Sequence, residues 1–99
     1  MITVIAKLKV KPGKGQALEL AARELIAHVK ANEPGTRTYV FLRSTGDPGT
    51  YAFYEVYADE GAFAAHGGSG PMQAFFGALG GLLDGRPEIA MYDELDAKR

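Results

Sequence analysis

The sequence predicts an α+β domain of the ferredoxin-like type, in which a four-stranded antiparallel sheet carries its helices on one face. Three observations predict this fold. The 99 residues are enough for one domain, taken here as residues 1–99, and 46% of them are hydrophobic. The period of the apolar residues switches between that of a strand and that of a helix, in the order βαββαβ. Both faces of the two middle strands are apolar, which predicts a covering partner.

The first strand and the first helix differ clearly in period. Over residues 2–10 every even position is apolar, which is the pattern of a strand, and the turn at residues 11–15 ends it. From residue 16 to about 33 the apolar residues recur at helical spacing, as Leu18, Ala22, Leu25, Ile26 and Val29. Pro34 and Gly35 are expected to end the helix, since proline prevents its continuation and glycine accepts a left-handed closing conformation.

A hairpin and a divided second helical region complete the chain. Two strands are expected at residues 36–44 and 51–58, joined by a loop rich in glycine, proline and aspartate. Asp59 is placed to cap a short helix over residues 60–66. A glycine-rich break separates this helix from a second one that begins at Pro71 and reaches about residue 83. A last strand is expected over residues 88–95.

Charge and composition argue against several classes of function. The formal net charge is −1 and no basic stripe is present, so neither nucleic acid nor an anionic membrane surface is the expected partner. The absence of cysteine excludes disulfides, thiolate catalysis and cysteine-ligated metal sites. The N-terminal residues have the pattern of a strand rather than a signal peptide, and no segment has the length of a membrane span, so a cytoplasmic location is expected.

The apolar character of both sheet faces predicts a symmetric homodimer. One parity of the middle strands carries the residues Tyr39, Phe41, Tyr51, Phe53 and Tyr57. The other parity carries the residues Val40, Leu42, Tyr54 and Val56. One face is expected to pack under the helices and the other against a second copy of the chain. The pattern leaves open which parity does which, and Glu55 shares the parity of the first set.

A spaced set of short motifs adds a resemblance to a known family. The motifs are Lys9-Val10-Lys11-Pro12-Gly13, Pro34-Gly35 before Tyr39, Tyr54-Glu55-Val56-Tyr57, and Phe63-Ala64-Ala65-His66 followed by Ser69 and Phe75. Together they resemble the antibiotic biosynthesis monooxygenase family of dimeric α+β barrels, over residues 4 to about 94. The resemblance implies a cofactor-independent monooxygenase without a metal, which oxidises a quinol or a polycyclic phenol with dioxygen.

The sequence also departs from the family pattern and leaves alternatives open. Tyr57 stands where family members often carry tryptophan, and Ser69-Gly70-Pro71 replaces a Ser-Pro-His run. The chain has no tryptophan, which argues against the haem-degrading members. A glycine loop over residues 67–70 before a helix N-terminus keeps an isomerase of a small phosphorylated metabolite as one alternative. A non-catalytic ligand-binding dimer is the other.

Two residues are candidates for catalysis. Histidine side chains can exchange protons near neutral pH, and His66 matches the family position, so it is the candidate base; alternatively, it only caps the end of its helix. Glu55 lies among aromatic residues, where a carboxylate needs a partner or a raised pKa. It is either a site residue or, paired with Arg43, an organiser of the dimer interface. His28 matches no family position and is expected at the surface or at a rim.

Six further residues are candidates for binding the substrate. Tyrosines on the strands can line a ring-shaped pocket and donate hydrogen bonds, and residues of the last helix can form an apolar wall. Asn32 is expected either to cap the end of the first helix or to point into the same cavity. The candidate substrate-binding residues are Tyr39, Tyr57, Asn32, Ser69, Met72 and Phe76.

Overall fold

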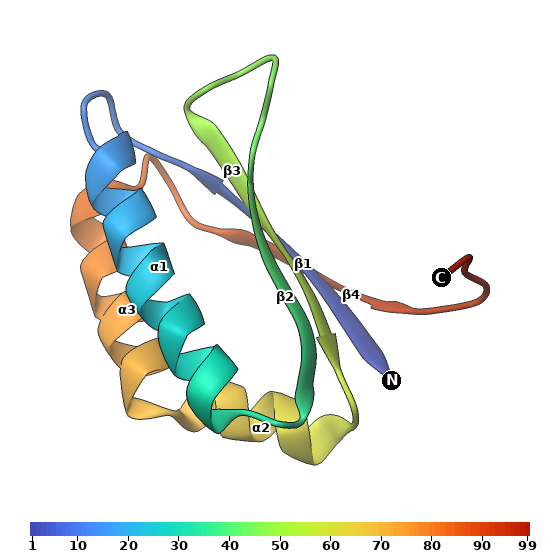
Figure 1. The fold of residues 1–99 in the computed structure, drawn as a ribbon. Coiled ribbons are helices and arrows are strands. Elements are labelled where there is room, and N and C mark those ends of the chain that lie inside the picture. The colour runs from blue at the N-terminus through green and yellow to red at the C-terminus, as the bar shows by residue number, and fades with distance from the viewer.

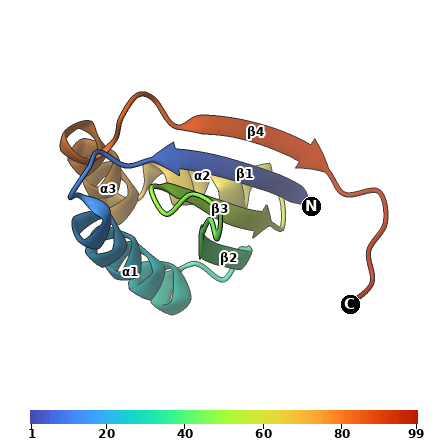
Figure 2. The ribbon, with the colours of Figure 1, turned by 90° about the horizontal axis from the view of Figure 1, so that it is seen from above.

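The computed structural model describes residues 1–99 and has four strands and three helices. Their bounds are β1 Ile2–Lys9, α1 Gly15–Asn32, β2 Thr36–Arg43, β3 Thr50–Tyr57, α2 Glu60–Gly68, α3 Gly70–Leu82 and β4 Glu88–Asp93. The strands form one antiparallel sheet in the order β2-β3-β1-β4 (Figure 1). All three helices lie on one face of this sheet, as the view from above shows (Figure 2). The predicted ferredoxin-like fold with a divided second helix is confirmed.

Helix α1 buries the predicted apolar stripe, but it ends differently from the expectation. Leu18 and Leu25 are buried against the sheet, and the helix stops at Asn32, with Glu33 as its C-terminal cap. Gly35 does not adopt a left-handed conformation, because only Gly13 and Gly85 have positive φ. A Cβ atom at Gly35 would lie 2.6 Å from the Cβ of Ala62 in α2. Glycine is therefore required here by the close approach of α2, and the predicted reason was wrong.

The break between α2 and α3 is a single residue, Ser69. It is the C-terminal cap of α2 and the N-terminal cap of α3 at the same time. Its hydroxyl donates to the carbonyl oxygen of His66 (2.9 Å) and accepts the N–H of Met72 (3.2 Å). The glycine loop predicted over residues 67–70 is therefore wrong, since three of its four residues belong to helices. The serine bonds explain this, because they satisfy backbone groups that helix ends otherwise leave free.

A bulge in β2 brings two residues of opposite parity to the same sheet face. Thr36 pairs with Tyr57 and Thr38 pairs with Val56, so the register shifts between them. A bulge adds one residue to a strand and reverses the facing of the residues after it. As a result, Thr36 and Tyr39 both lie on the face of Glu55, although simple alternation places them on opposite faces.

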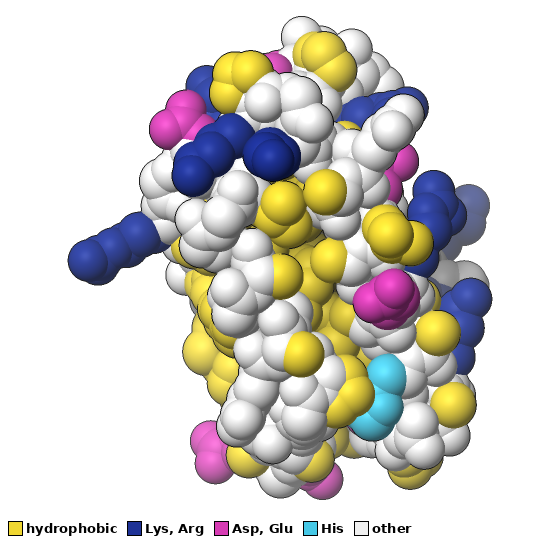
Figure 3. All heavy atoms as spheres, turned by 90° about the vertical axis from the view of Figure 1, so that its left-hand side faces the viewer, with side chains coloured by type: hydrophobic (Ala, Val, Ile, Leu, Met, Phe, Trp, Pro, Cys, Tyr) yellow, Lys and Arg dark blue, Asp and Glu magenta, His cyan; other side chains and the backbone are white.

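The structure decides which set of alternating residues in the middle strands faces the helices. The inner face, under the helices, carries Tyr51, Phe53 and Tyr57, which are all nearly inaccessible to solvent. The outer face carries Val40 and Leu42, which are 40% and 48% exposed. Seen from the helical side, hydrophobic side chains also follow a hollow down the middle of the molecular surface (Figure 3).

No helix is long and apolar enough to span a membrane.

Candidate functional site

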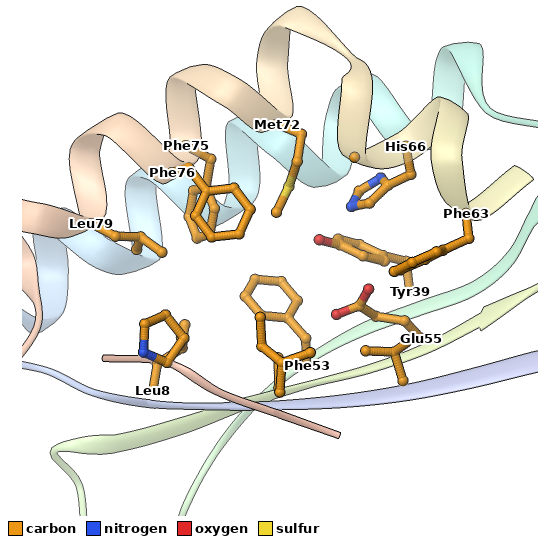
Figure 4. Close-up of a pocket in the computed structure, with 15 residues that line it drawn as sticks. Leu8, Tyr39, Phe53, Glu55, Phe63, His66, Met72, Phe75, Phe76 and Leu79 are labelled. Carbon is orange, nitrogen blue, oxygen red and sulfur yellow. The ribbon is translucent and has the colours of Figure 1, made fainter. Parts of the chain in front are cut away.

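A cavity lies between the inner face of the sheet and helices α2 and α3 (Figure 4). Its volume is about 120 Å³, and 11 of its 15 lining residues are hydrophobic. Phe53 rises from the sheet opposite Met72 and Phe76 of the helical layer. Phe76 and Ile89 line the cavity and are about half exposed, so the cavity opens to solvent between α3 and β4.

Polar side chains gather at one end of this cavity. His66 comes from α2, Tyr39 from β2 and Glu55 from β3, and Figure 4 shows their polar atoms directed toward one another and toward the cavity. The rings of His66 and Tyr39 lie 4.9 Å apart between centroids. Residues from three separate elements therefore place an imidazole, a phenol and a carboxyl group beside an apolar space.

His66 is buried and leaves one nitrogen free of partners. Its side chain is 3% exposed, and Nδ1 lies 2.8 Å from Oε1 of Glu33. Nε2 is buried without any hydrogen-bond partner. Since buried polar atoms are nearly always paired, an unpaired imidazole nitrogen lining a cavity marks a contact point for a ligand. The alternative prediction, that His66 only caps its helix, does not account for this inward orientation.

The carboxyl group of Glu55 accepts a hydrogen bond from within the chain, and its pKa is raised. The hydroxyl of Tyr57 donates a hydrogen bond to Oε1 of Glu55. Burial raises the pKa of Glu55, although the Tyr57 bond, and His66 when it is protonated, act in the opposite direction. The predicted partner Arg43 instead lies 3.5 Å from Glu19, so the interpretation of Glu55 as half of an Arg43 ion pair was wrong.

Tyr39 remains a hydrogen-bond donor over the whole physiological range. Burial raises its pKa, and the negative charges of Glu55 and Glu33 raise it further. Figure 4 shows its hydroxyl directed into the polar end of the cavity. It can therefore donate to an oxygen atom of a bound molecule without losing its proton.

The structure brings together five of the eight predicted site residues. The cavity is lined by Tyr39, Glu55, His66, Met72 and Phe76. Tyr57 lies behind Glu55 and does not reach the cavity surface, and Ser69 joins α2 to α3. Asn32 is exposed and donates to the carbonyl oxygen of His28 (3.2 Å), so it caps the end of α1 and does not enter the cavity.

Glu33 belongs to the site and was missed by the sequence reasoning. Its side chain is only 9% exposed and contacts His66, with which it shares no sequence motif. One signal was available. A carboxylate at a helix C-terminus is disfavoured by the helix dipole, so Glu33 at the end of α1 needs a specific partner.

The lining of the cavity also limits the ligands it can take. None of its 15 residues is a lysine or arginine, so it offers no side-chain cation to a phosphate group. The N–H of Met72 in the first turn of α3 is already bonded to Ser69. The structure contains no group of three or more His, Cys, Asp or Glu side chains arranged to hold a metal ion.

Comparisons with known proteins agree on one family. The family model described as antibiotic biosynthesis monooxygenase matches residues 1–78. The "Putative monooxygenase YcnE" of Bacillus subtilis is 32% identical over 75 residues, which are 76% of this chain and 78% of that protein.

Two solved structures show the same fold over nearly the whole chain. A "putative antibiotic biosynthesis monooxygenase" from Caulobacter crescentus is 39% identical, with a TM-score of 0.90, and the match covers 96% of this chain and 90% of that one. A conserved protein from Methanosarcina mazei is 30% identical, with a TM-score of 0.88 and coverage of 95% and 92%.

Proposed function

This chain belongs to the antibiotic biosynthesis monooxygenase family, and we propose that it is a cofactor-independent monooxygenase that oxidises a single-ring hydroquinone with dioxygen. One observation carries the proposal: the unpartnered Nε2 of His66 at the polar end of an apolar cavity. A base beside an apolar space that can hold the ring is what removal of a phenol proton requires.

The size of the cavity supports a substrate with one ring. Its volume of about 120 Å³ is close to the roughly 150 Å³ of an apolar protein cavity that holds benzene. A polycyclic phenol needs more room than this, so we favour the quinol over the polycyclic substrate. The four phenylalanine rings of the lining suit the faces and edges of an aromatic ring; they are Phe53, Phe63, Phe75 and Phe76.

The proposed reaction balances without any added cofactor. Hydroquinone and dioxygen give a hydroxyquinone and water, so one oxygen atom enters the ring and the other leaves with two substrate hydrogens. His66 takes a phenol proton, and the electron-rich anion passes one electron to dioxygen. The two radicals then join to form a ring carbon–oxygen bond. The O–O bond breaks as that ring carbon loses its hydrogen as a proton, and the distal oxygen leaves as water.

Tyr39 and Glu55 have complementary roles in this scheme. The Tyr39 hydroxyl donates to the substrate oxygen as negative charge develops on it. Glu55, whose pKa is raised by burial, can hold a proton and deliver it to the departing distal oxygen. The hydrogen bond from Tyr57 keeps the Glu55 carboxyl oriented while it does so.

Oxygen uptake with a panel of hydroquinones tests the proposal. The protein is dialysed against a chelator and assayed with single-ring and multi-ring hydroquinones, using 18O2 and mass spectrometry of the product. We expect one labelled oxygen atom per product molecule, a preference for single-ring substrates, and unchanged activity after chelation. His66→Ala should lower kcat by roughly 100-fold or more, whereas Glu24→Gln, an exposed change on α1, should leave kcat unaltered.

Three results would contradict the proposed function. The first is the absence of turnover with every member of the panel. The second is formation of unlabelled quinone with hydrogen peroxide, which would indicate an oxidase. The third is full activity of His66→Ala, which would remove the histidine from the mechanism.

We also propose that the outer sheet face packs against a second copy of the chain. The exposed side chains of Val40, Leu42 and Tyr92 support this, because an apolar face of this kind is rarely left open to water. Thr3 and Val56, paired across β1 and β3, are already buried on the same face. A twofold arrangement is the simplest way to cover such a face. The cytoplasmic location stays a prediction.

A further inference from the structure

We infer that Glu33 is the positioning residue of His66 and that it fixes the imidazole tautomer that leaves Nε2 bare toward the cavity. The role of His66 as a base rests on the proposed function, but the tautomer does not depend on it. The inference is drawn from a chain of contacts that runs from the end of α1 to the cavity. Its members are Asn32, His28, Glu33, Thr36 and His66.

The tautomer of His28 is fixed by its contact with Asn32, at the outer end of this series of contacts. The side-chain amide of Asn32 donates to the carbonyl oxygen of His28 (3.2 Å), and the same nitrogen lies 3.2 Å from Nδ1 of His28. An amide NH2 group has two hydrogens to donate and no lone pair to offer. Nδ1 of His28 is therefore the acceptor, and the ring proton of His28 lies on Nε2.

That proton faces Glu33. Nε2 of His28 lies 3.2 Å from Oε2 of Glu33, a close polar contact without good hydrogen-bond alignment. The His28 side chain is 23% exposed and the Glu33 side chain 9%. His28 thus covers the carboxylate from the solvent side and supports its negative charge.

The inner oxygen of Glu33 receives the two stronger bonds. The Thr36 hydroxyl donates to Oε1 at 2.8 Å, and Nδ1 of His66 lies 2.8 Å from the same atom. An ionised carboxylate only accepts hydrogen bonds, so Nδ1 of His66 must carry the proton. Glu33 therefore selects the Nδ1–H form of the ring, as carboxylates do for histidines that act as bases.

The consequence appears at the opposite nitrogen of His66. A neutral imidazole has one proton, so Nε2 presents a lone pair. A doubly protonated ring would instead hold a charged, unpaired N–H group against the apolar lining, which costs more than an unpaired neutral acceptor. Tyr39 and Tyr57 pack on the ring at centroid distances of 4.9 and 5.5 Å, and the carboxyl group of Glu55 is directed toward the same end of the cavity. The structure thus holds His66 ready to accept a proton.

The experiment measures the tautomer directly. Long-range 1H–15N correlation spectra of 15N-labelled protein at neutral pH distinguish Nδ1–H from Nε2–H. We expect the wild-type His66 ring to carry its proton on Nδ1. Glu33→Met removes both carboxylate oxygens and leaves no acceptor for Nδ1–H, so we expect the His66 proton to move to Nε2. An Nε2–H ring in the wild type, or an unchanged tautomer in the variant, would overturn the inference.

Kinetics provide a second readout. Glu33→Gln should lower kcat about 100-fold, within the range of general-base catalysis, because His66 loses its carboxylate partner. KM should change by less than about threefold, because Glu33 does not line the cavity. Glu24→Gln is the matched control, because it makes the same chemical change at an exposed position of α1. Equal loss in both variants, or a loss confined to KM, would contradict a positioning role.

A milder pair of variants covers the case in which Glu33→Gln does not fold. Thr36→Val removes the hydroxyl that holds Glu33 and should lower kcat about tenfold, whereas Thr36→Ser keeps the hydroxyl and should restore it to within about twofold. Equal activity of the two variants would overturn the inference. If the wild-type protein oxidises no hydroquinone, the proposed function fails, and the tautomer measurement still decides the role of Glu33.

Discussion

The two faces of the sheet are built from similar apolar residues but are covered in different ways. On the inner face, helices bury Phe53 and Tyr57 together with the ionisable Glu55, and His66 faces them from α2. On the outer face, nothing in the chain covers Leu42, which is 48% exposed. Figure 2 shows the helices on one side of the sheet only.

This difference matches the two proposed roles, catalysis at the inner face and association through the outer face. Glu55 is bonded to Tyr57 and Nδ1 of His66 lies against Glu33, so these groups keep their geometry while lying next to an apolar cavity. Removal from water strengthens their electrostatic interactions. The outer face has no ionisable cluster of this kind at its centre, and its exposed apolar side chains suit contact with an equally apolar surface.

The largest effect on stability is expected from truncating a buried side chain of the inner face. Phe53→Ala removes a side chain that is 2% exposed and packs on Tyr39, Phe41 and Phe75. Chemical denaturation should show a free energy of unfolding lower by about 3 to 5 kcal/mol. Leu20→Ala, at a position that is 62% exposed on α1, should change it by less than about 0.5 kcal/mol. Similar losses in both variants would mean that the inner face is not the core.

A smaller effect is expected from charging the outer face. Leu42→Glu places a carboxylate on the proposed contact face, on the edge strand β2, and repeats it in the second copy. Light scattering after size-exclusion chromatography should show a dimer for the wild type and a shift toward monomer for the variant, with a dissociation constant raised roughly tenfold or more. The far-ultraviolet circular dichroism spectrum should remain unaltered. A wild-type monomer at all concentrations would refute the proposed dimer.

The smallest effect concerns the pH dependence that the inner face imposes through Glu55. Burial raises the pKa of this carboxyl group above its ordinary value of 4.5. Above pH 4.5 the folded chain therefore binds more protons than the unfolded chain. The stability contributed by Glu55 is lost as the pH rises through the pKa that Glu55 has in the folded state.

Glu55→Gln has no such titration, so it tests this dependence. Relative to the wild type, we expect the variant to gain stability as pH rises from about 4.5 toward neutrality, as measured by thermal unfolding at a series of pH values. A constant difference between the two proteins over that range would show that Glu55 titrates normally. Phe41→Leu, a change without an ionisable group, serves as the pH-independent control.

Much of the fold could be predicted from local patterns. Alternation over β1 and the stripe formed by Leu18, Ala22 and Leu25 reflect the periods of strands and helices, which depend only on neighbouring residues. The expected strand at residues 88–95 ends earlier, at Asp93, and the expected loop over residues 67–70 is mostly helical. Both differences arise at element ends, where caps and packing decide the boundary.

Less of the site could be predicted from the sequence, because its contacts join distant segments. His66 could be chosen as a candidate because it matches the family position, and Glu55 because a carboxylate among aromatic residues is chemically conspicuous. Asn32 was left between two interpretations, and the structure assigns it to the end of α1 through its bond to His28. Glu33 contacts a residue 33 positions away, and no period of the sequence indicates such a pair.

The sequence alone therefore determined the order of elements and the presence of two apolar sheet faces, since these depend on backbone geometry and side-chain polarity. Only the tertiary structure decided which face the helices cover. The bulge in β2 brings Thr36 and Tyr39 to the same side, and simple alternation does not foresee it. The enclosed volume and the pairing of Glu33 with His66 arise from the packing of α1 and α2 over the sheet, which involves the whole chain.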